Sequence, residues 1–186
     1  MKITVIIPVF NEAESVQPLS EKIKKALKNF RYEVIFINDG SKDRTENSIK
    51  TIIQKNYNFT CLNFKRNYGQ TAALQAGFDY AKGDIIVAID GDLQNDPADI
   101  PKLINKLEEG YDVVSGWRKN RKDKSFSRII PSKIANYIIS KISGVELHDY
   151  GCTLKAYKRE VIENIKLYGE MHRFIPIYAS WEGAKV

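Results

Sequence analysis

Two acidic residues separated by a single glycine are the most informative feature of this sequence. Asp90 and Asp92 follow the apolar run Ile85–Ile89. Residues two apart in extended backbone point to the same side, so the two carboxylates could together hold a hard divalent cation. Gln94, another two residues along, could add an amide oxygen. Because loops are rich in Asp, the position directly after an apolar run is what favours a metal site over an ordinary loop.

Polar residues also follow three other apolar runs. The four segments are Phe10–Glu12, Asn38–Ser41, Lys65–Gly69 and Asp90–Gln94. In open parallel sheets, ligands bind outside the carboxyl ends of the strands. We therefore expect all four segments to line one crevice.

The elements that must position these segments alternate along the first two thirds of the chain. Apolar runs predict strands at Ile3–Val9, Glu33–Asn38, Thr60–Phe64, Asp84–Ile89 and Asp112–Ser115. Amphipathic stretches between them predict helices at Ser15–Lys28, from Thr45 onward, at Thr71–Lys82, and from Asp96-Pro97 to Gly110. Thr45 and Asp96 are predicted N-caps. This alternation predicts an α/β fold with a mostly parallel sheet and helices on both faces.

The pattern changes after Trp117. We expect a basic loop first, and then a helix at Ser132–Ile142, a short strand at Thr153–Tyr157, and helical stretches at Arg159–Lys166 and Phe174–Trp181. Gly183–Val186 looks like a turn entering a strand, where a natural chain seldom stops. We therefore expect the 186 residues to be one domain from a longer protein.

The positive charge is concentrated in one segment. The chain has 29 Lys and Arg against 23 Asp and Glu, a formal charge of +6. Arg118–Arg128 alone holds six basic residues and one acid. A solvated loop is one interpretation. Nucleic-acid surfaces usually interleave aromatic residues with the basic ones, whereas here only Trp117 and Phe126 flank the run. We favour a loop that faces phosphate or a membrane.

Several classes of protein lack support in the sequence. Two cysteines cannot form a disulfide framework, and no apolar stretch approaches the length of a membrane span or a signal peptide. The fingerprints of dinucleotide-binding proteins, P-loop NTPases, zinc proteases and serine hydrolases are all absent. An acidic crevice with a basic loop suits a metal-bound nucleotide diphosphate.

At this point the motifs match a known family. The chain resembles glycosyltransferase family 2, nucleotide-sugar transferases with a GT-A (Rossmann-like) fold, over residues 3 to 118. The resemblance rests on Pro8–Glu12, Asn38–Thr45, Asn67–Gly69, Gly83-Asp84, Asp90–Gln94 and Gly116–Arg118. Three further segments, Asp90–Pro97, Asp149–Arg159 and Arg173–Pro176, are similar to the polyprenyl-phosphate branch, which includes dolichol-phosphate mannose synthases and undecaprenyl-phosphate aminoarabinose transferases.

The resemblance implies roles for individual residues. It implies nucleotide-sugar binding by Pro8, Phe10, Glu12, Ile37, Asp39, Asp90, Gly91, Asp92 and Gln94. It implies Mg²⁺ or Mn²⁺ binding by Asp90, Asp92 and Gln94, phosphate binding by Arg118 and Arg128, and catalytic roles for Asp92, Arg118 and Asp149. Two positions depart from the family pattern: Phe10 stands where Tyr is usual, and Asn38 where Asp is common.

The implied reaction is inverting transfer of a sugar from a nucleotide-diphosphate sugar to a polyprenyl phosphate, at the cytoplasmic face of a membrane. Residues 1–118 would form the nucleotide-sugar half and residues 119–186 the acceptor half, ending before expected membrane segments. Asp149 would act as a base or orient the acceptor.

Three alternative interpretations differ in the substrate or partner of the chain. A family member acting on a saccharide acceptor is the nearest alternative. A nucleotidyltransferase would normally carry a basic, Gly-rich loop after the first strand, where this chain has Phe10–Glu12. A nucleic-acid-binding module is the least favoured reading.

Overall fold

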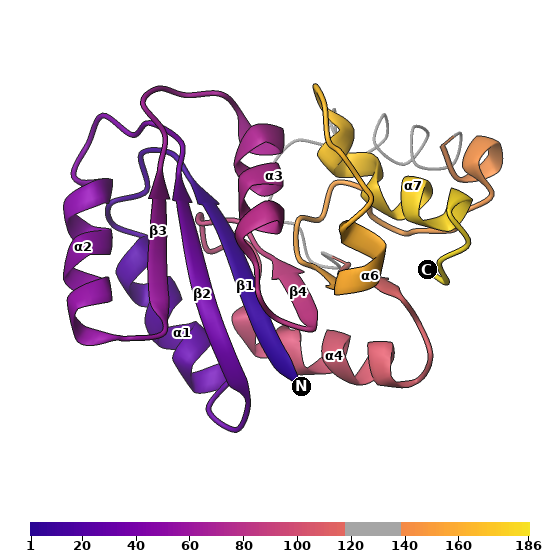
Figure 1. Cartoon of the computed structure of the whole chain (residues 1–186), viewed down its shortest axis with the longest axis horizontal. Coiled ribbons are helices and arrows are strands. Elements are labelled where there is room, and N and C mark those ends of the chain that lie inside the picture. The colour runs from indigo at the N-terminus through magenta and orange to yellow at the C-terminus, as the bar shows by residue number, and fades with distance from the viewer. Residues whose placement is uncertain (118–138) are drawn as a thin grey trace, which may run out of the picture.

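A six-stranded sheet is the centre of the computed structural model, which describes residues 1–117 and 139–186 (Figure 1). The strand order is β3-β2-β1-β4-β6-β5. The strands are β1 (Lys2–Val9), β2 (Arg31–Asn38), β3 (Phe59–Asn63), β4 (Ile85–Ala88), β5 (Val113–Ser115) and β6 (Lys155–Lys158). Strands β1 to β4 pair in parallel, so their carboxyl ends meet at one edge.

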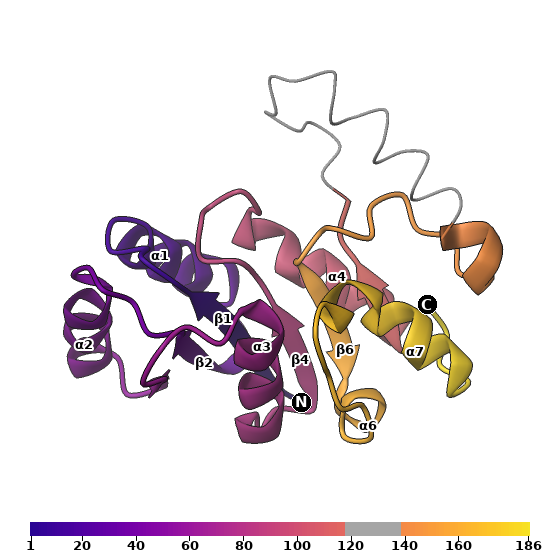
Figure 2. The same cartoon turned by 90° about the horizontal axis from the view of Figure 1, so that it is seen from above.

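Helices cover both faces of this sheet. The helices are α1 (Val16–Ala26), α2 (Thr45–Lys55), α3 (Gln70–Tyr80), α4 (Ile100–Glu108), α6 (Arg159–Ile162) and α7 (Ile175–Trp181), with 3₁₀ turns η1 (Pro97–Asp99) and η2 (Met171–Phe174). Alternate residues of β1 divide between the two cores: Val5 packs with α1, α2 and α4, whereas Ile6 packs with α3 and α7. Figure 2 shows α1 and α4 on one side of the sheet and α3 on the other.

The predicted mostly parallel α/β fold is confirmed, with one insertion that the sequence did not reveal. Strand β5 runs in the direction of β4 but does not pair with it, because β6 lies between them, antiparallel to both. The predicted strand at Thr153–Tyr157 is thus an internal strand of the same sheet.

The predicted helix boundaries have mixed outcomes. Asp96 is an N-cap as predicted, because its side chain accepts a hydrogen bond from the Ala98 N–H at 3.1 Å. Thr45 is not a cap: the helix begins with it, and its hydroxyl accepts the Glu12 N–H instead. Helix α6 ends at Ile162, so the expected helix up to Lys166 is too long.

The predictions for the end of the chain are tested only in part. The expected helix at Ser132–Ile142 lies mostly outside the described residues, and positions 139–143 are helical. A turn does include Gly183, and beyond it the Lys185 carbonyl accepts the N–H of Asp112 at 2.8 Å. No helix in the described part of the chain is long and apolar enough to cross a bilayer.

Helix α3 lies unusually close to the sheet because of Gly77. A Cβ at this position would lie 2.4 Å from Ile6 Cγ2 and 3.1 Å from Ile37 Cδ1. Both isoleucines are fully buried, so neither methyl group can move into solvent. Glycine therefore sets the distance at which α3 packs, and with it the place of its first turn at the carboxyl edge of the sheet.

A segment close to the C-terminus forms hydrogen bonds and an ion pair with side chains of α3. The Nδ1 atom of His172 lies 2.7 Å from Thr71 Oγ1, the Leu167 N–H donates to Gln75 Oε1 at 2.8 Å, and Lys166 pairs with Asp79 at 3.1 Å. The helix partners are four residues apart, so they form one stripe along α3. We refer to Lys166–His172 as the brace of α3.

We predict that Gly77→Ala destabilises the protein. Overpacking of a buried site costs about 1–3 kcal/mol, which exceeds the ~1 kcal/mol that Ala gains over Gly in a helix. The 2.4 Å contact with a buried methyl group places the cost in the upper part of this range. The expected net loss in the free energy of unfolding is therefore about 1–2 kcal/mol, measured by urea denaturation. An unchanged or raised stability would contradict the close approach.

We also predict that the brace weakens in acid. Burial lowers the pKa of His172, against the opposing effect of Glu170 and together with Arg173 and Lys155. The unfolded chain therefore binds more protons, so stability falls as pH drops below the ordinary imidazole pKa of about 6.5. We expect the free energy of unfolding, measured by urea denaturation between pH 7.5 and 5.5, to fall less steeply with decreasing pH in His172→Gln than in the wild type. An equal slope in both proteins would exclude this contribution.

Candidate functional site

A cavity of about 330 Å³ opens at the carboxyl ends of β1, β2 and β4. It is lined by Pro8, Val9, Phe10, Glu12, Asp39, Asn67, Gly69, Gln70, Ala73, Asp90, Gly91 and Asp92. All four predicted strand-end segments therefore contribute lining residues to this one cavity, as expected. This edge is where ligands bind in open α/β sheets.

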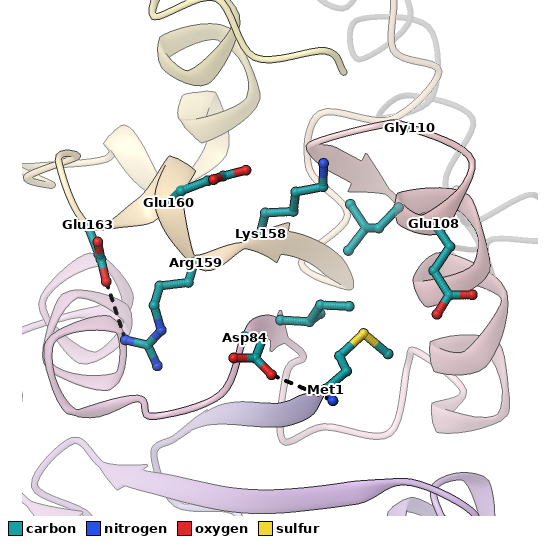
Figure 3. A pocket seen from close by; sticks show the side chains of 10 residues that line it. Met1, Asp84, Glu108, Gly110, Lys158, Arg159, Glu160 and Glu163 are labelled. Carbon is teal, nitrogen blue, oxygen red and sulfur yellow. Dashed lines mark ion pairs between the residues drawn. The ribbon is translucent and has the colours of Figure 1, made fainter.

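A larger cavity of about 580 Å³ lies at the opposite edge, between the start of β4 and the end of α4 (Figure 3). Four of its charged groups form two ion pairs: the N-terminal ammonium lies 3.9 Å from Asp84, and Arg159 lies 3.6 Å from Glu163. Arg159 also donates to the carbonyls of Gly83 and Ala81. These contacts join α6 and the N-terminus to the segment before β4, so we assign this cavity a structural role despite its size.

Asp39 builds one wall of the smaller cavity. Its two carboxylate oxygens accept the N–H groups of Tyr68 at 2.7 Å and Gly69 at 2.9 Å, and the residue is 4% exposed. The turn that follows Asp39 is equally constrained, because Gly40 has φ +69° and a Cβ there would lie 2.3 Å from the Arg66 carbonyl carbon. Asp39 thus holds the loop before α3, while its predicted contact with a nucleoside stays a prediction.

The loop after β1 presents an aromatic ring and an acid. Phe10 is 42% exposed and lines the cavity, so a planar base could stack on it. The Glu12 N–H donates to Thr45 Oγ1 at 2.8 Å, and the Glu12 carboxylate accepts from Ser15 Oγ at 2.7 Å. These bonds tie the loop to α2 and to the N-cap of α1. Pro8, Phe10 and Glu12 lie on the wall of the cavity, while their predicted contact with a nucleotide stays a prediction.

Asp90 and Asp92 both line the cavity, although the geometry predicted for them is wrong. Strand β4 ends at Ala88, and the chain turns from Gly91 onward, with Leu93 at φ +63°. Gly91 lets this turn pack against β1, because a Cβ there would lie 2.7 Å from Val9 Cγ1. A turn, and not extended backbone, brings the two acids to one place.

Two predicted nucleotide-site residues lie elsewhere. Gln94 is exposed and absent from the cavity lining, and its backbone N–H donates to Asp92 Oδ1 at 3.0 Å. Its contribution is to orient Asp92, because the turn at Leu93 directs the chain away. Ile37 is fully buried beneath α3, so its side chain belongs to the core and not to the cavity.

The donor set suits a divalent cation that a ligand helps to coordinate. Within residues 1–117 and 139–186, no three His, Cys, Asp or Glu side chains cluster as a complete metal site. The cavity supplies the two carboxylates Asp90 and Asp92. Mg²⁺ is commonly held by one or two carboxylates together with phosphate oxygens. The residues present therefore fit Mg²⁺ or Mn²⁺ bound together with a diphosphate.

Asp149 lies outside the cavity lining, in the loop before β6. It is 6% exposed, and its Oδ1 accepts the Gly151 N–H at 3.1 Å. The same loop contacts the turn that follows the cavity acids, because Cys152 Sγ donates to Asn95 Oδ1 at 3.3 Å. The other predicted acceptor-side residues, Arg118 and Arg128, lie outside the described residues, as does the basic segment between them.

Sequence reasoning missed Gln70 as a lining residue. Its Nε2 donates to Asp90 Oδ1 at 2.7 Å, and it is the first residue of α3. The available signal was its position directly after the Asn67–Gly69 motif, at the predicted start of a helix that reaches the crevice. Val9, the last residue of β1, and Ala73, in the first turn of α3, line the same cavity.

Solved structures confirm the GT-A fold. A mannosyltransferase from Pyrobaculum calidifontis, in complex with GDP-Man and Mn²⁺, superposes with a TM-score of 0.73 at 19% identity, over 98% of this chain and 53% of that one. A glucosyl-3-phosphoglycerate synthase from Mycobacterium tuberculosis, in complex with Mn²⁺ and UDP, gives 0.67 at 20% identity, over 86% and 57%.

Sequence comparisons reach closer relatives. Dodecaprenyl-phosphate galacturonate synthase of Rhizobium johnstonii is 48% identical over 184 residues, which are 97% of this chain and 54% of that protein. An undecaprenyl-phosphate 4-deoxy-4-formamido-L-arabinose transferase of Photorhabdus laumondii is 42% identical, over 96% and 56%. The chain therefore spans about half the length of the curated relatives it matches. The family model for glycosyl transferase family 2 matches residues 4–166, and the chain belongs to this family.

Proposed function

We propose that this chain is the catalytic domain of an enzyme that transfers a sugar from a nucleotide-diphosphate sugar to a polyprenyl phosphate. The observation that carries the proposal is the cavity at the carboxyl edge, whose lining includes Phe10 and Glu12 together with Asp90 and Asp92. The acceptor class is supported by the relatives at 48% and 42% identity, whose names specify polyprenyl phosphates.

The cavity residues divide between the two ends of a nucleotide diphosphate. Phe10 offers its exposed ring to the base, and Asp39 keeps the loop before α3 in place beside it. Asp90 and Asp92 would hold Mg²⁺ or Mn²⁺ against the diphosphate. The cation supplies neutralisation of the charge that develops on the leaving nucleoside diphosphate.

The chemical step is a displacement at the anomeric carbon. A phosphate oxygen of the lipid forms the new bond to that carbon, the bond to the nucleoside diphosphate breaks, and the configuration inverts. The attacking oxygen is already anionic near neutral pH, so a strong base is not required. We assign Asp149 to orientation of the acceptor, and Arg118 and Arg128 to contacts with phosphates.

We predict that donor binding depends on a metal ion and on Asp92. A nucleotide sugar at 100 times its Kd stabilises the folded state by about 2.7 kcal/mol. For a domain of this size, that raises the Tm by roughly 5–10 °C. A thermal-shift screen of UDP- and GDP-sugars should give this shift with Mn²⁺ and lose it with EDTA or in Asp92→Asn.

Asp99→Asn is the matched control, because Asp99 is a half-buried acid of η1 that pairs with Lys102 and does not line the cavity. It should keep the full shift. A shift that persists in EDTA, or that survives Asp92→Asn, would remove the assignment of the metal to this cavity.

We further propose that the basic segment contacts an anionic membrane at its cytoplasmic face, and predict salt-sensitive binding to liposomes. Each Lys or Arg close to such a surface contributes about 1 kcal/mol. Neutralising Lys119, Arg121, Lys122 and Lys124 should therefore lower the affinity for phosphatidylglycerol vesicles about 1000-fold at low salt, measured by co-sedimentation over a range of lipid concentrations. Binding that ignores both salt and these four substitutions would leave the segment as a solvated loop.

The acceptor class has its own test. Radiolabelled donor should be transferred to undecaprenyl phosphate by the full-length protein. Transfer to an oligosaccharide in its place would favour the saccharide-acceptor alternative.

A further inference from the structure

The amide of Gln70 contacts an acid that lines the cavity. Its Nε2 donates to Asp90 Oδ1 at 2.7 Å, and Gln70 itself lines the cavity next to Asp90. The two residues are 20 positions apart and belong to different elements, α3 and the turn after β4. The contact is therefore produced by the tertiary fold and not by local chain geometry.

The chemistry of this donor suits a carboxylate that binds a cation. An amide N–H orients a carboxylate without adding a charge, so the negative charge of Asp90 is kept. A Lys or Arg in the same place would form an ion pair and compete with an incoming cation. Hydrogen bonds of this kind, made to metal-binding carboxylates from outside the coordination shell, fix the direction of the ligand and tune its affinity.

The backbone of Gln70 is held on both sides. On one side, the N–H of Gly69 donates to Asp39 Oδ2 at 2.9 Å. On the other side, the hydroxyl of Thr71 is hydrogen-bonded to His172 Nδ1 at 2.7 Å. Because Gly77 fixes the distance of α3 from the sheet, the amide reaches Asp90 from a position set by the core. A donor held in this way loses little conformational entropy when it orients its acceptor.

We propose that Gln70 is a positioning residue for the metal site, holding Asp90 in the orientation in which it binds a divalent cation with the diphosphate. This inference rests on the proposed function, because it requires that Asp90 binds the metal. Gln70 is only half-buried, so loss of its hydrogen bond costs little folding stability, and its effect falls on metal affinity.

The test compares Gln70→Leu, which removes the amide at similar volume, with the wild-type chain. Mn²⁺ affinity is measured by electron paramagnetic resonance titration with saturating UDP or GDP, whichever raises the wild-type Tm more. We expect the Mn²⁺ Kd to rise about 10–100-fold, the range found when such outer partners are removed. The Tm without ligand should stay within a few degrees of wild type, and high Mn²⁺ should restore nucleotide binding.

Gln17→Leu is the control, because Gln17 lies exposed on α1 and its amide donates to Glu21, one turn along the same helix. It should leave the Mn²⁺ Kd unchanged. An unchanged Kd in Gln70→Leu, with normal binding by the wild type, would overturn this inference and leave the proposed function intact. Absence of Mn²⁺ binding by the wild type would overturn the proposed function, and this inference with it.

Discussion

The start of α3 is tied to three parts of the molecule, and the shape of the cavity depends on it. Asp39, at the end of β2, binds the N–H groups of Tyr68 and Gly69. The side-chain amide of Gln70 donates to Asp90, which follows β4, and the hydroxyl of Thr71 is hydrogen-bonded to His172 of the brace. Because these contacts involve successive residues, a shift of the helix end by an ångström would move both walls of the cavity together.

The first turn of α3 can lie at this edge only because two glycines let neighbouring segments approach each other closely. Gly77 lets α3 pack against Ile6, and Gly40 lets the turn after β2 pass beside the backbone of Arg66. At Gly40 the obstacle is backbone, which cannot rotate away as a side chain can. Packing between α3, the sheet and the turn after β2 therefore sets the backbone positions around the cavity. The polar side chains that line the cavity are placed by that packing.

Much of the site followed from the sequence because the fold is regular. Apolar runs identified β1 to β4, and a parallel sheet brings the carboxyl ends of such strands together. Phe10, Glu12, Asp39, Asp90 and Asp92 could therefore be grouped from the sequence alone. Local rules also identified Asp96 as an N-cap. Ile37 was misassigned because a resemblance transfers positions and not the direction of a side chain, which here points into the core.

Interactions between distant residues escaped prediction. The antiparallel insertion of β6 depends on hydrogen bonds between segments about 70 residues apart, for which periodicity gives no signal. The pairing of Gln70 with Asp90 and of Thr71 with His172 has the same character.

The sequence by itself determined the fold class, the family resemblance and the edge at which the acids gather, since these follow from short-range pattern and strand direction. Only the tertiary structure decided which groups touch, since a hydrogen bond across 20 or 100 residues requires the whole core to fix both partners within a fraction of an ångström.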